Sequence, residues 1–277
     1  MRLHVRHRTH YQYDHPVFLD PHVLRLKPPT NATQRLISHD IAIDPAPAGR
    51  SENSDLGGNE TVTAWFNDLT DHLTITTTST VDTLRSNAYD FIWDGPHELP
   101  LAYPEAALSI LGAYREAGFL DATVLALVIA ITEMTNGDAQ LLPEMLNSHL
   151  YKTIGKVVRD FGEPLQPAET LRRGEASCRD LTVLYLAVAR ACGFAGRFVS
   201  GYYAGIDELE EYELHAWPEL YIPGGGWRGF DPTAGLAVAD RHIALAYAPS
   251  AELAMPVSGT YRGSATSSMQ THVAITG

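Results

Sequence analysis

Cysteine is scarce in this sequence, which contains only two, Cys178 and Cys192, among 277 residues. Two thiols are too few for a disulfide framework or a cysteine-rich zinc site. They cannot pair with each other either, because both fall in one predicted helix, roughly 20 Å apart along its axis. A disulfide requires Cα atoms within about 7 Å. Free thiols are typical of a reducing compartment, so we expect a cytoplasmic location.

Long apolar runs are also lacking. None reaches the roughly 18–20 residues that a membrane-spanning helix needs. The best candidate, residues 122–131, is too short and is soon followed by Glu133. The N-terminal residues carry charge but no apolar segment of the kind that a secretory signal contains. We therefore expect neither a signal peptide nor a membrane partner.

Positive charge is in deficit. Lysine and arginine total 20 against 33 aspartates and glutamates, which gives a formal net charge of -13. This balance argues against non-specific binding to nucleic acid and against docking on anionic membranes, and it mildly favours neutral or basic partners. The hydrophobic fraction of 45% is ordinary for a soluble globular protein. Such a chain can bury a core without disulfides or structural metals.

Histidine, by contrast, is plentiful. The sequence contains 12 histidines, and eight of them fall within the first 97 residues. These N-terminal histidines show no metal-ligand spacing, and we interpret them as surface residues. They are His4, His7, His10, His15, His22, His39, His72 and His97.

The first ~85 residues follow a β pattern. A half-buried strand is indicated by residues that alternate with polar ones, namely Leu3, Val5, Thr9, Tyr11 and Tyr13. Turn signals such as DPAPAG and DLGGNE separate the further strand candidates. These candidates are VLRLKP, LISHDIAIDP, ETVTAWFND and HLTITTTSTVDTL. Several short strands at close spacing predict a small β-sandwich domain over residues 1–85.

The pattern then becomes mixed, and we predict a second, α+β domain over residues 86–277. From Pro104 onward, apolar residues recur at three- and four-residue steps, which predicts helices. Another helix is predicted from about Cys178 to Cys192, with Gly193 as its stop. The segments RFVSGYYAG, ELHAWPELYI and WRGFDPT read as strands, and PGGG reads as the loop of a hairpin. The tail ends in a last strand candidate, THVAIT.

Cys178 lies at the predicted N-terminus of its helix. Unpaired backbone N–H groups and the positive end of the helix dipole favour an anion there, and the thiolate is the reactive form of cysteine. The same N–H groups could bind an oxyanion. Cys192 lies at the opposite end of this helix, where the dipole opposes a thiolate. We therefore interpret Cys178 as a candidate nucleophile and Cys192 as structural, although a buried structural role is common for any cysteine.

His215 and Asp231 complete a candidate set of nucleophile, base and orienting carboxylate. In a strand, His215 and Trp217 face away from the apolar residues around Leu220, so we expect His215 on the more polar face. Counting back through the PGGG loop places Asp231 opposite Pro218, three residues from His215. A direct contact then needs a diagonal reach, a bulge or a different loop length.

The stretch from SCRDL through LHAWPELYI to FDPT resembles the transglutaminase-like core of bacterial proteins. In that family a cysteine before a helix, a histidine in an HAW-type motif and an aspartate in a DPT-type motif form the catalytic triad. The resemblance assigns these roles to Cys178, His215 and Asp231. The N-terminal run HRTHYQYDHPV…LRLKPP…GGNE resembles the small β domain that precedes this core in many bacterial members. A papain-like core behind a β-sandwich is therefore expected.

Two features depart from the pattern of that family. Ala176 stands where relatives usually carry glycine, two residues before the cysteine, which could tighten backbone access beside the nucleophile. Relatives also carry a GRDY-like motif after the DPT strand, and here the matching region, residues 246–263, reads AYAPSAELAMPVSGTYRG.

The resemblance implies thiolate attack on an amide carbonyl through a thioester acyl-enzyme, with no metal or organic cofactor. We expect hydrolysis of a peptide or protein amide, because bacterial members are often described as proposed cysteine proteases. The alternatives are transfer to an amine, as in protein cross-linking, and a non-catalytic binding module on the same fold. Residues 207–213, DELEEYE, hold five carboxylates just before His215, so a basic substrate is a further hypothesis, against a solvated surface loop.

Overall fold

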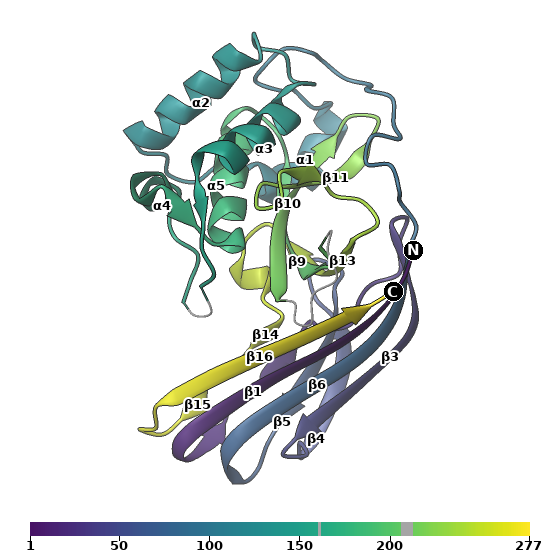
Figure 1. Ribbon diagram of the computed structural model, residues 1–277, viewed down its shortest axis with the longest axis vertical. Helices are drawn as coiled ribbons and strands as arrows, with labels where there is room; N and C mark the ends of the chain where they lie inside the picture. The colour runs from purple at the N-terminus through teal and green to yellow at the C-terminus, as the bar shows by residue number, and fades with distance from the viewer. Residues whose placement is uncertain (160–161, 206–212) are drawn as a thin grey trace.

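The computed structural model describes residues 1–159, 162–205 and 213–277. Figure 1 shows a β-sandwich in one half of the molecule and, in the other half, helices packed over a separate sheet. No helix among the described residues is long and apolar enough to cross a membrane. The expected α+β, papain-like core preceded by a small β-sandwich is confirmed.

The sandwich consists of two antiparallel sheets. The longer strands form the first sheet, in the order β15-β1-β6-β3, with β16 also paired to β1. Their bounds are β1 Arg2–Leu19, β3 Gln34–Asp44, β6 Leu69–Thr83, β15 Tyr261–Arg262 and β16 Ser267–Thr276. The second sheet has the order β14-β2-β5-β4, with bounds β2 His22–Leu24, β4 Gly49–Ser54, β5 Glu60–Trp65 and β14 Val257–Ser258. Between residues 3 and 9 of β1, every second side chain is buried, as the alternation predicted for Leu3, Val5 and Thr9.

The tail strand lies elsewhere than its place in the sequence suggested. We assigned it to the second domain, but β16 runs antiparallel to β1, from Ser267 opposite Tyr13 to Thr276 opposite His4. The yellow C-terminal strand lies beside the purple N-terminal strand in Figure 1. This pairing satisfies the backbone groups on one side of β1, which β15 alone covers only at Phe18 and Leu19.

The second half carries the helices and a five-stranded sheet of order β12-β11-β10-β9-β13. The strands are β9 Gly196–Tyr203, β10 Leu214–Ile222, β11 Gly226–Asp231, β12 Leu236–Ala237 and β13 His242–Ala248. The helices are α1 Glu105–Arg115, α2 Ala122–Met134, α3 Leu142–Thr153, α4 Pro167–Arg173 and α5 Cys178–Ala191, with a 3₁₀ turn at Glu252–Ala254. Two short strands, β7 Gly155–Lys156 and β8 Glu175–Ala176, run parallel just before α5.

Helix α5 is the centre of this half. Its fully buried stripe packs against β10 and against α2, α3 and α4, and consists of Leu181, Leu184, Tyr185 and Val188. Burying each of the three aliphatic side chains of this stripe contributes roughly 1.5–3 kcal/mol. The predicted stop is also present, because Gly193 has a φ of +93° and a Cβ there would lie 2.5 Å from the Leu101 carbonyl. The stripe fixes the helix on the sheet, and thereby fixes where its first residue lies.

Strand β13 is an edge of the sheet, and two amide side chains from the sandwich take up its outward backbone groups. Gln34 accepts from the Ala244 N–H at 2.8 Å and donates to the Ala244 carbonyl at 3.0 Å. Asn59 does the same for Tyr247, at 2.9 and 3.0 Å. Each amide thus replaces one residue of a neighbouring strand, and the edge is covered.

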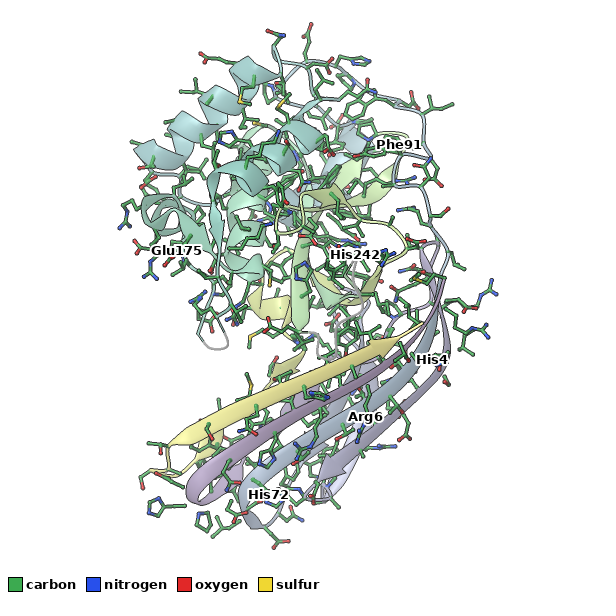
Figure 2. The ribbon with its side chains drawn as sticks, in the orientation of Figure 1. His4, Arg6, His72, Phe91, Glu175 and His242 are labelled. Carbon is green, nitrogen blue, oxygen red and sulfur yellow. The ribbon has the colours of Figure 1, made fainter. Side chains whose placement is uncertain are left out.

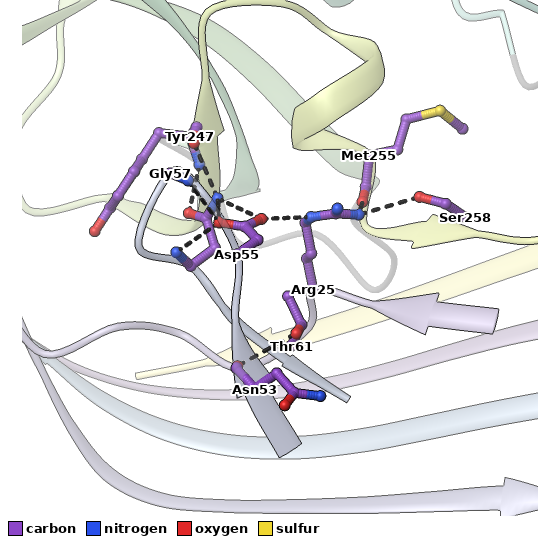
Figure 3. A network of polar contacts seen from close by, with 9 residues as sticks. Arg25, Asn53, Asp55, Gly57, Thr61, Tyr247, Met255 and Ser258 are labelled. Carbon is purple, nitrogen blue, oxygen red and sulfur yellow. Dashed lines mark hydrogen bonds and ion pairs between the residues drawn. The ribbon is translucent and has the colours of Figure 1, made fainter. Parts of the chain in front are cut away.

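A second network lies next to this edge. Figure 3 shows Asp55 bonded to Arg25, whose guanidinium reaches the Met255 carbonyl and the Ser258 hydroxyl. The Asn59 amide also donates to Asp55. Tyr247, Met255 and Ser258 belong to the region that departs from the GRDY-like pattern. In this protein that region therefore joins the two halves of the molecule.

Several local features differ from the sequence expectations. Helix α4 and, among the strands, β4 and β13 were not predicted. Two of the eight N-terminal histidines are buried rather than on the surface. His7 is 1% exposed and His22 is 6% exposed. His7 lies between Thr9 and the Tyr202 hydroxyl, at 2.9 and 3.0 Å, so its burial is compensated by hydrogen bonds.

Candidate active site

Cys178 is the first residue of α5, as the sequence predicted, and its side chain is half-buried. The helix start is fixed by the Asp180 carboxylate, which accepts from both the N–H and the hydroxyl of Ser177 at 2.9 and 2.7 Å. Asp180 itself is fully buried, and its other oxygen accepts from Arg159 and from the Leu165 N–H. One buried carboxylate thus ties the preceding segment to the turn that presents the thiol.

Cys192 occupies the other end of the helix and is 3% exposed. Burial raises the pKa of its thiol above the usual range, which keeps it protonated. This agrees with the structural role expected for Cys192.

The Asp231 carboxylate meets the His215 ring directly, with Asp231 Oδ2 2.7 Å from His215 Nε2. Asp231 is fully buried, and its other oxygen accepts from the backbone N–H groups of Thr233 and Ala234 at 2.9 and 3.0 Å. The DPT turn therefore holds the carboxylate as well as reversing the chain. Only 12% of the His215 side chain is exposed.

The hairpin register explains this contact. Gly226 pairs with Ile222 and Gly229 with Glu219, so the loop is one residue shorter than the PGGG interpretation assumed. The expected placement of Asp231 opposite Pro218 was therefore wrong. Counting two residues further along both strands brings Asp231 level with Trp217, on the same face as His215. Such diagonal neighbours are about 7–8 Å apart at Cα, within reach of histidine and aspartate side chains.

The face that carries His215 was expected to be polar, and this was wrong for its neighbour. Trp217 is 1% exposed and packs with Val199 and Ala244 in a small apolar cluster. Its ring lies so close to Gly201 that a Cβ there would come within 2.5 Å of it. The candidate base therefore lies beside an apolar, water-excluding surface, and the low local dielectric strengthens its electrostatic interaction with Asp231.

The charges within the site depend on one another. Burial alone would lower the pKa of His215, but the charge and hydrogen bond of Asp231, together with the Cys178 side chain, hold it well above the usual range. Burial likewise opposes ionisation of Asp231, but the two histidine rings beside it hold the pKa of that carboxyl far below the usual range. The pairing favours an imidazolium on His215 and a carboxylate on Asp231. Because Nε2 of His215 is bonded to Asp231, Nδ1 is the ring nitrogen that is available to interact with Cys178.

The second of those rings is His242, which the sequence had not indicated. It opens β13, and its Nε2 lies 3.1 Å from the same Oδ2 of Asp231. Figure 2 shows His242 in the half that carries the helices, well away from His4 and Arg6 on the sandwich. The apolar run HIALAYA could have predicted a buried strand that begins with a histidine two residues after Asp240.

The donor atoms of His215, Asp231 and His242 lie within 4.8 Å of one another, which raises the question of a metal. Ligand atoms about 2 Å from a tetrahedral zinc stand ~3.3 Å apart. The separations of 2.7 and 3.1 Å to Asp231 are shorter than that and are ordinary hydrogen-bond lengths. We therefore interpret the group as a proton-sharing cluster.

The remaining expectations concern Ala176 and the acidic segment. Ala176 is 1% exposed and belongs to the hydrophobic core behind α5, so its methyl group does not narrow the approach to the thiol. Of the acidic segment, Glu213 is described and exposed, whereas residues 207–212 lie outside the described residues. The hypothesis of a basic substrate therefore stays a prediction.

A cysteine-bearing helix packed on an antiparallel sheet that carries a bonded histidine–aspartate pair defines the transglutaminase-like class. Residues 132–232 match the family described as the transglutaminase-like superfamily. Residues 3–82 match the bacterial transglutaminase-like N-terminal region. The chain therefore belongs to the bacterial transglutaminase-like proteins.

Its relatives extend along most of the chain. An uncharacterized protein of Mycobacterium tuberculosis is 30% identical over 273 residues, which cover 88% of this chain and 82% of the relative. An uncharacterized protein of Mycobacterium leprae is 24% identical, over 99% of this chain and 98% of the relative. The crystal structure of a proposed cysteine protease from Cytophaga hutchinsonii has a TM-score of 0.73 at 19% identity, and covers 100% of this chain and 90% of that one. At that identity the likeness shows the fold alone.

Proposed function

We propose that this protein is a cysteine-nucleophile amide hydrolase in which Cys178 attacks, His215 transfers protons and Asp231 holds the ring. The observation that carries the proposal is the bonded pair of His215 and Asp231, with the Cys178 side chain among the groups that raise the pKa of His215. The proposed base thus interacts with both the proposed orienter and the proposed nucleophile, and the three residues lie on three different elements of the fold.

The proposed reaction has two halves. The Cys178 thiolate adds to the amide carbonyl carbon, the C–N bond breaks, and the leaving amine takes the proton of the His215 imidazolium. This leaves a thioester and a neutral imidazole. Water then attacks the thioester while His215 accepts its proton, and the C–S bond breaks to release the acid and restore the thiolate. The N–H of Cys178, at the start of α5, is the proposed oxyanion donor.

Transfer to an amine differs only in the second half, where an amine replaces water. We favour hydrolysis on the strength of the expectation drawn from the sequence, and the two are distinguished by adding a primary amine to a reacting peptide. Release of free acid alone supports hydrolysis, and a new amide product supports transfer. A non-catalytic scaffold would show neither product.

The first test of the proposal is a contrast in thiol reactivity. An ordinary free thiol has a pKa of about 8.5. We expect iodoacetamide to alkylate Cys178 in the folded protein at a pH well below that value. The reason is the helix start and the His215 imidazolium, which is retained as the pH rises until it passes the raised pKa of His215. Mass-spectrometric mapping across a pH series measures the labelling.

Cys192 is the internal control, because it shares the helix but is buried at its other end. It should stay unlabelled until the protein is unfolded. Equal labelling of the two thiols in the folded state, or faster labelling of Cys192, would overturn the assignment of Cys178 as the nucleophile.

We also propose that the carboxylates of residues 207–213 attract cationic segments of the substrate. Exposed charges are screened within about 10 Å at 0.1 M salt, so the effect belongs to substrate capture. We expect kcat/KM for a lysine-containing peptide to fall with added salt and in the triple variant E208Q/E210Q/E211Q. A neutral peptide of the same length is the control. If both peptides respond alike, this segment does not select charge.

A further inference from the structure

Asp231 is held by more donors than a catalytic carboxylate requires. Backbone N–H groups of Thr233 and Ala234 bind Oδ1, and the rings of His215 and His242 both bind Oδ2. A carboxylate offers about four lone-pair sites, so these four contacts fill it. His215 therefore shares its acceptor atom with a second histidine.

His242 is built into the structure as a fixed donor. Its side chain is 1% exposed, the Tyr203 ring stacks on it at 4.5 Å between centroids, and the Trp217 ring meets it edge-on at 5.1 Å. Its Nδ1 is buried and has no hydrogen-bond partner among the described residues. A protonated Nδ1 would be a buried orphan donor, so the proton lies on Nε2 and is donated to Asp231.

The ionisable groups that face this ring come from three neighbouring strands. They are Tyr203 on β9, His215 and Glu219 on β10, and Asp231 on β11. Asp231 is the one in hydrogen-bond contact, and Glu219 is paired with Arg197. Burial is the main cause that lowers the pKa of His242, and the His215 charge lowers it further. His242 is therefore neutral while His215 is charged, and the two rings play different parts.

Building on the proposed function, we infer that His242 is a positioning residue of this site: its Nε2–H donor fixes Asp231 Oδ2 and shares that atom with His215. The sharing limits how strongly Asp231 stabilises the imidazolium through its Nε2–H. The His242 ring thereby keeps the proton on His215 Nδ1 acidic enough to pass to the leaving amine, while it holds the carboxylate in place. Such a residue acts through Asp231 and does not touch the reacting atoms.

The test titrates His215 by NMR in protein with ¹⁵N-labelled histidine rings, and its signal is assigned by its loss in His215→Gln. The variant H242F keeps an aromatic ring but removes the Nε2–H donor, so that Asp231 Oδ2 no longer shares its charge between two rings and interacts with His215 more strongly. We expect its midpoint to rise by about one pH unit, the size that corresponds to one lost hydrogen bond to a charged group. H242Q places an amide N–H near the same point and should restore the wild-type midpoint. No turnover is needed, so failure here is separate from failure of the hydrolase proposal, which Cys178 alkylation tests.

The matched control is H22F, which removes a buried histidine of the sandwich and should leave the His215 midpoint unchanged. An unchanged or lower midpoint in H242F, or an H242Q protein that behaves like H242F, would overturn the inference. If H242F does not fold, the wild-type spectrum decides. His242 should then show a neutral ring protonated on Nε2 from pH 5 to 9, and a charged ring or an Nδ1–H tautomer would contradict the proposed role.

Discussion

Replacing Cys178 or His215 with alanine is expected to abolish turnover of any amide substrate that the wild-type protein hydrolyses. The loss should be on the order of 10⁴-fold or more, as when a member of a nucleophile–base pair is removed. Asp231→Asn should retain a weak residual activity, because the amide misorients the His215 ring without removing it. Because Asp231 is buried between two histidine rings, we expect the loss of activity in Asp231→Asn to be larger than for an exposed carboxylate.

The measurement is kcat/KM on a peptide and amide library, with circular dichroism to show that each variant is folded. C192A is the matched control, because it removes a thiol from the same helix at a distance from His215. Its activity should remain close to that of the wild type, with a modest loss of stability from the buried methyl-sized gap. A wild-type rate in His215→Ala would reject the mechanism.

The parts of this site that the sequence predicted are those with local patterns. Cys178 begins an amphipathic helix whose apolar stripe repeats at three and four residues, and this local pattern predicts where the helix starts. His215 and Asp231 lie on strands flanking a glycine-rich loop, a local hairpin signal. The alternation in β1 likewise gave its buried face from Leu3 onward.

The parts that the sequence did not predict depend on pairings between distant segments. The tail strand joins β1 across almost the whole chain, and no local pattern specifies that partner. The role of His242 becomes visible only when β13 is placed next to β9, and the Tyr202 hydroxyl that bonds the buried His7 comes from the distant strand β9. The position of Asp231 relative to β10 depends on whether the hairpin loop has three or four residues, and a run of glycines does not specify that length.

Asp180 is the second position at which we expect a large effect, and the measured quantity there is stability together with thiol reactivity. Its side chain is 1% exposed and pairs with Arg159, which is 27% exposed. Asp180→Ala leaves the Arg159 charge and the N–H groups of Ser177 and Leu165 without their acceptor. Breaking a buried ion pair costs about 3–5 kcal/mol, and the partial exposure of Arg159 reduces this to ~2–4 kcal/mol.

The same substitution should slow alkylation of Cys178, because Ser177 and the first turn of α5 lose the carboxylate that fixes them. A displacement of about 1 Å at a reacting group lowers the rate up to 10²-fold, so we expect a tenfold or larger loss in the alkylation rate of Cys178.

Urea unfolding gives the stability of the variant, and the iodoacetamide rate at pH 7 gives the reactivity of its thiol. Glu169→Gln is the control, because it removes only the surface ion pairs of Glu169 with Arg172 and Arg173 on the neighbouring helix α4. It should change neither quantity measurably. In a double-mutant cycle with Arg159→Gln, Asp180→Ala should cost less than it does alone, because no unpaired charge is left behind. Equal costs in the two backgrounds would show that Asp180 acts through its backbone contacts alone, and an unchanged alkylation rate would show that it does not position Cys178.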